Sequence, residues 1–221
     1  MPASSLTSRL AAAVADETSG ATEIVREVID GLLALADDPG RLWQAADLLA
    51  DRLPWCAPMW HVVAAAHAGQ PELALRSLRQ RLDLDADRSV TTAVRLLTAR
   101  GCAVRTAPGS SLVGAILAAL PPPSGPPTGV VGLAGADGLG SAELLNITGT
   151  RDLAAAVPTI VVATSAKVVP DEAFERLGAP GFERVPLELF ESVVLDGEVL
   201  TPAEAGRRAA SLLPVTSRHS G

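Results

Sequence analysis

Two short stretches in the second half of the chain are apolar almost throughout, and they constrain the fold more than any other feature. Residues 130–133 read VVGL and residues 159–163 read TIVVA. A strand with one face in water alternates apolar and polar residues, whereas a strand buried on both faces does not. Helices are predicted before and between these strands, at 110–120 and about 150–156. The pattern therefore predicts a parallel sheet with helices on both faces.

The alternation of strands and helices begins at about residue 86. Ser89 is suited to cap a helix over 89–98, and Gly101 is suited to end it. The other predicted elements are a strand at 102–106, a turn at 108–109, a stiff PPPSGPP connector at 121–127, a helix at 170–177, an extended segment at 187–195 and a helix at 202–213 capped by Thr201. We predict an α/β fold class, with a small Rossmann-like parallel-sheet domain over residues 86–221.

The pattern of the first 85 residues predicts helices and no strands. Apolar residues recur there at spacings of three and four, which places them on one helix face. About five helices are expected, near residues 10–14, 24–33, 42–53, 59–66 and 72–82, with breaks at Pro39-Gly40 and at the turn 69–71. We therefore predict an all-helical domain over residues 1–85.

Composition excludes several classes of function. The net charge is −7 with no basic block, so direct binding of nucleic acid is not expected. No apolar run approaches the roughly 20 residues of a membrane span, and the N-terminus lacks the apolar core of a signal peptide. Cys56 and Cys102 lie far apart and are predicted to be free thiols. These features predict a cytoplasmic protein without membrane contact.

The only asparagine and the only lysine of the chain, Asn146 and Lys167, fall in one short stretch, although arginine is abundant. Lys167 follows the strand 159–163, and Asp137 follows the strand 130–133. Ligands of open α/β sheets bind beyond the carboxyl ends of the strands, so these side chains are expected to converge there. Gly149 and Thr150 open the next helix, where backbone N–H groups suit a phosphate.

Each candidate residue has a chemical role and an ordinary structural alternative. Lys167 is expected to neutralise an anion, Asn146 to bind a sugar hydroxyl, and Asp137 to accept a proton or bind a hydroxyl. Alternatively, Asp137 caps its loop, Gly149 and Thr150 simply begin a helix, and Asn146 and Lys167 are retained by chance. No metal site or cofactor is predicted, because His61, His67 and His219 do not form a ligand set. Gly138 and Gly140 lack the third glycine of a dinucleotide motif.

Taken together, these residues resemble a known family, the translation initiation factor 2B alpha/beta/delta family. The resemblance rests on Gly135-Ala136-Asp137, Asn146, Gly149-Thr150 and Lys167, and on a tail with VPLE at 185–188 and LTPAE at 200–204. It is clear over residues 129–206 and loose over 1–128. The family includes ribose-1,5-bisphosphate isomerase and methylthioribose-1-phosphate isomerase. The resemblance implies a helical domain before a Rossmann-like domain, and a homodimer that pairs through the α/β domain.

The chain also departs from the family at functional positions. The family's Asn-Lys pair is Asn146-Ile147 here, and its Arg-Gly-Ala phosphate motif is absent. The stretch that corresponds to the isomerases' catalytic Cys segment, about 86–94, contains no Cys, so Asp137 lacks its proton-shuttling partner. We therefore predict a non-catalytic, dimeric binding or regulatory protein for a phosphorylated sugar or nucleotide. The alternatives are a sugar-phosphate isomerase with an altered active site, using Asp137 and Lys167, and a structural interaction module with a vestigial pocket.

Overall fold

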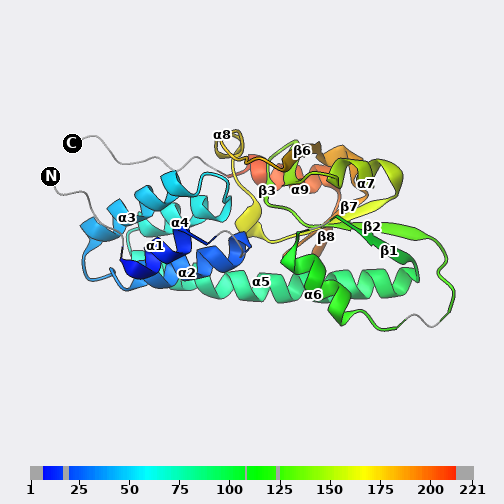
Figure 1. The fold of residues 1–221 in the computed structure, drawn as a ribbon, viewed down its shortest axis with the longest axis horizontal. Helices are drawn as coiled ribbons and strands as arrows, with labels where there is room; N and C mark the ends of the chain where they lie inside the picture. Colours follow the sequence, from blue (N-terminus) through cyan, green and yellow to red (C-terminus); the bar gives the residue numbers. More distant parts are fainter. Residues whose placement is uncertain (1–6, 17–19, 108, 123–124, 213–221) are drawn as a thin grey trace.

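The computed structural model describes residues 7–16, 20–107, 109–122 and 125–212 of the chain. Helices form the N-terminal half, and a sheet with helices on both faces forms the C-terminal half (Figure 1). This arrangement confirms the predicted fold class. The predicted turn at 108–109 and connector at 121–127 include residues outside the described set, at 108 and 123–124.

Five helices pack around one apolar core in the N-terminal half. They are α1 (Ser8–Val14), α2 (Ala21–Leu33), α3 (Pro39–Arg52), α4 (Pro58–Ala66) and the first part of α5 (Pro71–Arg100). Proline opens α3, α4 and α5, where its missing N–H leaves no helical bond unmade. Leu10, Ile29 and Leu49 from three of these helices are fully buried in the shared core. The predicted five-helix layer is therefore present.

Helix α5 is longer than the sequence pattern indicated. The two helices predicted over 72–82 and 89–98 are one continuous helix of 30 residues. Ser89 is not an N-cap, since it lies inside α5 and donates its hydroxyl to the Ala163 carbonyl at 3.1 Å. The linking residues contain no Gly or Pro, so nothing breaks the helix before Gly101 ends it with a φ of 59°. The predicted domain boundary between residues 85 and 86 lies within α5 and stays a prediction.

The main sheet has the strand order β1-β2-β5-β7-β8. Its strands are β1 (Ala103–Thr106), β2 (Val130–Ala134), β5 (Thr159–Ala163), β7 (Ser192–Leu195) and β8 (Glu198–Leu200). The first four are parallel, and β8 pairs antiparallel at the edge. Ile160 and Val162 face α5 and α6 (Ser111–Ala119), whereas Val161 and Ala163 face the opposite core, which includes α9 (Pro202–Ala210). Both faces are covered, as the apolar strands predicted.

A second, antiparallel sheet lies beside the first and was not predicted. It has the order β3-β4-β6, from β3 (Gly138–Leu139), β4 (Glu143–Ile147) and β6 (Phe182–Pro186). The sequence pattern predicted no strand between residues 134 and 150, where β3 and β4 lie. Asn146 therefore lies on a strand and not in a loop. The remaining elements are α7 (Thr150–Ala156), η1 (Ser165–Lys167), α8 (Asp171–Phe174) and η2 (Leu187–Leu189).

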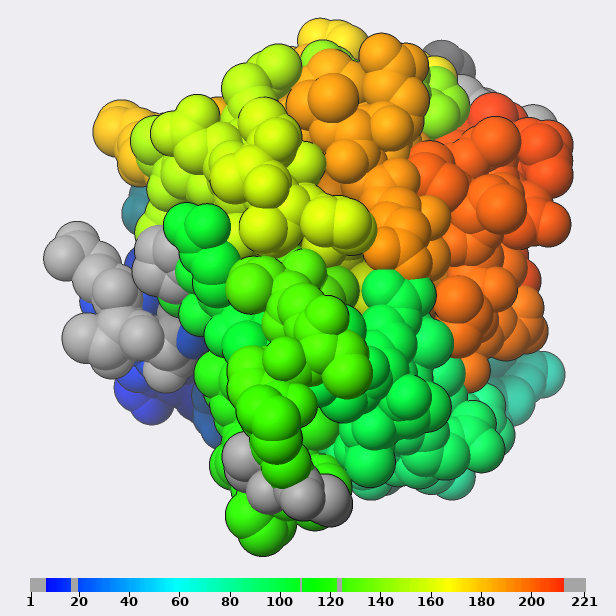
Figure 2. Space-filling model, turned by 90° about the vertical axis from the view of Figure 1, so that its right-hand side faces the viewer, coloured from blue at the N-terminus to red at the C-terminus, as the bar shows by residue number. Residues whose placement is uncertain are grey.

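Figure 2 views the end of the molecule opposite the N-terminal helices, where the segments of the α/β half meet. Residues of the 140s and 150s, in yellow-green, lie beside the orange segment that carries β6, and α9 occupies the red-orange side. Thr201 caps α9 with a capping box that includes Glu204, as predicted for Thr201. In the described part of the chain, no helix is both long and apolar enough to cross a membrane.

Candidate functional site

Asp137 and Lys167 meet at the carboxyl edge of the main sheet. Asp137 lies in the loop after β2, and Lys167 ends the short 3-10 helix η1 after β5. Strands β2 and β5 are parallel neighbours, so their carboxyl ends lie side by side. The ammonium Nζ of Lys167 is 3.6 Å from Oδ1 of Asp137. The structure thus brings together two residues that are separated along the chain by strands β3 and β4, helix α7 and strand β5.

The ammonium of Lys167 is held in an unusual setting for a lysine. Its side chain is 7% exposed, and that of Asp137 is 28% exposed. The separation of 3.6 Å exceeds the 2.7–3.2 Å of an N–H···O hydrogen bond, so the pair is electrostatic. An ammonium carries three N–H donors. Within the described residues Asp137 is its one ion-pair partner, so the arrangement can receive oxygen atoms of an anion.

Asn146 and Thr150 form a separate, buried pair. Asn146 donates Nδ2–H to the Thr150 hydroxyl at 2.9 Å, and that hydroxyl donates to the Ile147 carbonyl at 2.8 Å. Both side chains are nearly inaccessible. These bonds join the end of β4 to the first turn of α7. The contacts with a ligand that the sequence predicted for Asn146 and Thr150 remain predictions.

The start of α7 already holds a carboxylate. The Oε1 atom of Glu183, on β6, accepts hydrogen bonds from the backbone N–H groups of Gly149 at 2.8 Å and Arg151 at 2.9 Å. Gly149 precedes the helix with a φ of 102°, a conformation that glycine adopts without strain. A phosphate at this helix start would have to displace Glu183. The chain thus supplies its own anion at the place where the sequence predicted an external one.

Cys56 is a neighbour of this site that the sequence did not indicate. It lies between α3 and α4, with Sγ 3.9 Å from the Ala21 carbonyl oxygen. Burial raises the pKa of its thiol to about 11, while the positive charge of Lys167 lowers it and the charge of Asp137 raises it. The thiol therefore lies within electrostatic reach of both residues and is protonated at neutral pH.

No spacing in the sequence marks Cys56 as a neighbour of Asp137. The stretch 86–94, which the family resemblance aligned with a catalytic Cys segment, lies inside α5. Cys56 and Cys102 are both free, as predicted. Among the described residues, no group of three or more His, Cys, Asp or Glu side chains could hold a metal ion.

The loops after β1 and β2 touch beside Asp137. A Cβ atom placed on Gly135 would lie 2.3 Å from the Ser110 hydroxyl, so only glycine allows this approach. Ser110 caps α6 by accepting a hydrogen bond from the Val113 N–H at 3.3 Å. This close contact fixes the loop that carries Asp137.

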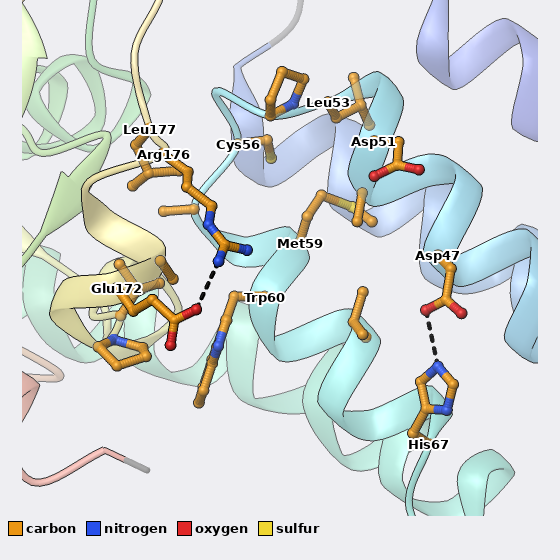
Figure 3. Close-up of a pocket in the computed structure, with 17 residues that line it drawn as sticks. Asp47, Asp51, Leu53, Cys56, Met59, Trp60, His67, Glu172, Arg176 and Leu177 are labelled. Atoms are coloured by element: carbon orange, nitrogen blue, oxygen red, sulfur yellow. Dashed lines mark hydrogen bonds and ion pairs between the residues drawn. The ribbon is translucent and has the colours of Figure 1, made fainter. Parts of the chain in front are cut away.

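A cavity of about 380 Å³ is lined in part by Cys56 (Figure 3). It lies between α3, α4 and the segment that includes α8. Its lining includes an Asp47–His67 pair, joined at 2.9 Å, and a Glu172–Arg176 pair at 2.6 Å. Asp137 and Lys167 do not line this cavity. The sheet-edge pair and this cavity are therefore separate features that share the Cys56 loop.

No protein-family model matches the sequence, and no curated protein matches it. Solved structures match its fold. Translation initiation factor eIF-2B from Pyrococcus horikoshii OT3 is similar with a TM-score of 0.69 at 13% identity, over 90% of this chain and 99% of that one. A chain of the tetrameric eIF2B-beta2-delta2 complex from Chaetomium thermophilum has a TM-score of 0.68 at 14% identity, over 92% of both chains.

An isomerase has the same fold. The 5-methylthioribose 1-phosphate isomerase from Pyrococcus horikoshii OT3 has a TM-score of 0.56 at 14% identity, over 90% of this chain and 86% of that one. At such identities the likeness is one of fold. It confirms at that level the resemblance that the sequence predicted, since the chain has the fold of eIF-2B subunits and of this isomerase.

Proposed function

We propose that the chain is an eIF-2B-like, non-catalytic binding or regulatory protein that holds a phosphorylated sugar or nucleotide beside Asp137 and Lys167. The observation that supports this proposal most directly is the buried ammonium of Lys167, 3.6 Å from a single carboxylate oxygen. A phosphate oxygen would supply the hydrogen bonds that this ammonium lacks within the described residues. Asp137 is exposed enough to accept a hydrogen bond from a sugar hydroxyl.

Two features favour binding without catalysis. Proton transfer at a carbon atom needs a base whose pKa lies near the working pH. The thiol of Cys56 has its pKa raised to about 11 by burial and is therefore a poor base or nucleophile at neutral pH. Glu183 occupies the N–H groups of Gly149 and Arg151, which removes a second phosphate position.

The proposal can be tested because Lys167 is the only lysine. An amine-reactive reagent can modify only its side chain and the N-terminal amine, and mass spectrometry separates the two. Ribose-1,5-bisphosphate, methylthioribose-1-phosphate and AMP are each added at increasing concentration. The expected result is that one of them slows modification of Lys167, leaves the N-terminal amine unaffected and raises the melting temperature. Equal labelling rates with all three, and no thermal shift, would reject the binding role.

The second candidate is a sugar-phosphate isomerase with an altered site. It is favoured by one observation, the position of the Cys56 thiol within electrostatic reach of Asp137. An isomerase must convert ribose-1,5-bisphosphate or methylthioribose-1-phosphate to its ketose, and the Asp137→Asn variant must lose that turnover. If neither substrate is converted but one of them protects Lys167 from modification, the isomerase role is rejected and the binding role stands.

We further propose that the protein is a cytoplasmic homodimer that pairs through its α/β half. The support is a chain of similar fold in the tetrameric Chaetomium thermophilum complex, and two cysteines that remain free rather than joined. Light scattering across a range of protein concentrations tests the oligomeric state. A monomeric mass at all concentrations would contradict the dimer without bearing on ligand binding.

A further inference from the structure

A second cavity, of about 390 Å³, lies at the carboxyl ends of β5 and β7. Thr164 and Leu195 line it from the strand ends, α4 and α5 line it from the helical half, and α9 lines it from the third side. Asp137 and Lys167 do not line it. Its volume falls within the range of about 300–1,000 Å³ that is usual for small-molecule sites.

Two side chains of opposite charge line this cavity from one helix without forming an ion pair with each other. Arg81 and Asp85 both line it and are four residues apart on α5, the spacing at which an ion pair closes readily. The Arg79–Asp83 pair of the same helix has that spacing and does close, at 2.5 Å. In the part of the chain that the structure describes, Arg81 makes no ion pair, and Asp85 has only the exposed Arg88 at 3.6 Å.

Asp85 is nevertheless a buried group. Its side chain is 12% exposed, and burial together with the charge of Asp196 raises its pKa. The charge of Arg81 opposes that rise and also lowers the pKa of His61, so its guanidinium lies close to both lining residues. Thr164, a residue that is 5% exposed, adds a hydroxyl that makes no capping bond. Arg81 is itself exposed to solvent, and within the described residues no hydrogen bond or ion pair joins these lining groups to one another.

The rest of the wall is apolar. Leu78 and Leu82 lie on the same face of α5 as Arg81 and Asp85, and Trp60 and Leu212 line the cavity from α4 and the segment after α9. Arg208 also lines it and is paired with Glu198. Arg81 favours an anion and Asp85 favours a cation. The surfaces match a ligand with one negative charge, one positive charge and a short apolar body.

We propose that this cavity binds a small zwitterion of the class of apolar α-amino acids. The ligand carboxylate lies on Arg81, its ammonium lies on Asp85, and its side chain packs against Leu78, Leu82 and Trp60. This site is distinct from the proposed phosphate site because Asp137 and Lys167 do not line the cavity, although Ser165, Ala166 and Val168, next to Lys167 in the chain, do. Each is therefore tested without reference to the other.

Calorimetric titration of the full chain tests the ligand class. L-leucine, L-methionine and L-phenylalanine are titrated separately, each beside its deaminated acid and its decarboxylated amine. At least one amino acid is expected to bind saturably, with both of its singly charged analogues about tenfold weaker or more. Absence of binding by all three amino acids, or equal affinity for either analogue, would overturn the proposal.

Variants test the two residues. Arg81→Gln should weaken the amino acid about tenfold or more, whereas Arg76→Gln, an exposed arginine of the same helix, should leave its affinity unchanged. Asp85→Asn should lose the preference for the amino acid over its deaminated acid. A damaged fold would lower the affinities for the amino acid and for its deaminated acid together. A change in the ratio of these two affinities therefore reports on the contact of Asp85 with the ligand ammonium. Wild-type affinity and selectivity in Arg81→Gln and Asp85→Asn would refute the assigned contacts.

Discussion

Replacing Lys167 with methionine removes the ammonium beside Asp137 and keeps an unbranched side chain of similar length. At 3.6 Å and an effective dielectric constant of about 20, the attraction between the two charges is about 5 kcal/mol. Desolvation of the buried ammonium costs several kcal/mol and offsets most of this attraction. Asp137 is 28% exposed, so water solvates its carboxylate once the ammonium is gone. We expect the free energy of unfolding without ligand to change by less than about 1 kcal/mol.

The effect on ligand binding should be much larger. A hydrogen bond to a charged group contributes about 1.5–3 kcal/mol, which corresponds to a ten- to hundredfold weaker Kd for the phosphorylated ligand. Lys167 also lowers the pKa of the Cys56 thiol against the effect of burial. The same variant should therefore slow alkylation of Cys56 at alkaline pH, because less of it is thiolate.

Urea unfolding measures the change in stability, and calorimetric titration with the ligand that protects Lys167 measures the change in Kd. Mass spectrometry measures the rate of Cys56 alkylation. Arg41→Met is the matched control, since Arg41 is exposed on α3 and also loses one positive charge. Wild-type affinity in Lys167→Met would refute the assignment of the phosphate to this ammonium. A loss of more than about 3 kcal/mol of stability would instead assign Lys167 a structural role.

Three further predictions concern stability. Gly135→Ala should cost about 1–3 kcal/mol because its Cβ would lie 2.3 Å from the Ser110 hydroxyl, and Ser110→Gly in the same chain should recover most of that loss in urea unfolding. The Arg100 hydrogen bond lowers the pKa of Glu191, so this carboxylate stabilises the fold above its ordinary pKa of 4.5 and less as the pH falls through its folded-state value. Because both side chains are about one-third exposed, Glu191→Gln should cost under about 1 kcal/mol at pH 7 and progressively less as the pH falls below 4.5, and a cost that does not change with acidification would contradict this. Burial lowers the pKa of His61, so stability should fall as the pH drops below 6.5 while the unfolded chain takes up the proton, and His61→Gln should flatten that slope between pH 7 and 5.

The elements that the sequence predicted well are those with a strong local signal. The apolar strands 130–133 and 159–163 have no polar face, and a sheet buried on both sides is the stable arrangement for them. Gly101 and Thr201 mark a helix end and a helix start by backbone conformation and side-chain capping, which are local properties. These signals come from residues that are neighbours in the chain, so they can be recognised without knowledge of the fold.

The sequence missed elements whose stability comes from distant partners. Strand β3 has only two residues, one of them a glycine, and β4 has five; they form a sheet because β6, some forty residues later, pairs with β4. The break predicted within α5 is absent because residues 83–88 contain no Gly or Pro, and Ser89, predicted as a cap, instead donates its hydroxyl to the distant Ala163 carbonyl. Hydrogen bonds between segments remote in the chain leave no periodic pattern in the sequence.

The candidate site likewise combines features that the sequence predicted with features that depend on distant partners. The sequence by itself determined that Asp137 and Lys167 follow adjacent parallel strands, and parallel strands end at one edge, so the two were expected to lie near each other. Tertiary structure alone decided that Glu183 occupies the start of α7, that Asn146 bonds to Thr150, and that the Cys56 thiol is buried within reach of both charges. The order of strands follows from local burial, whereas the partner of each polar group depends on which distant side chain the packing brings within about 3 Å.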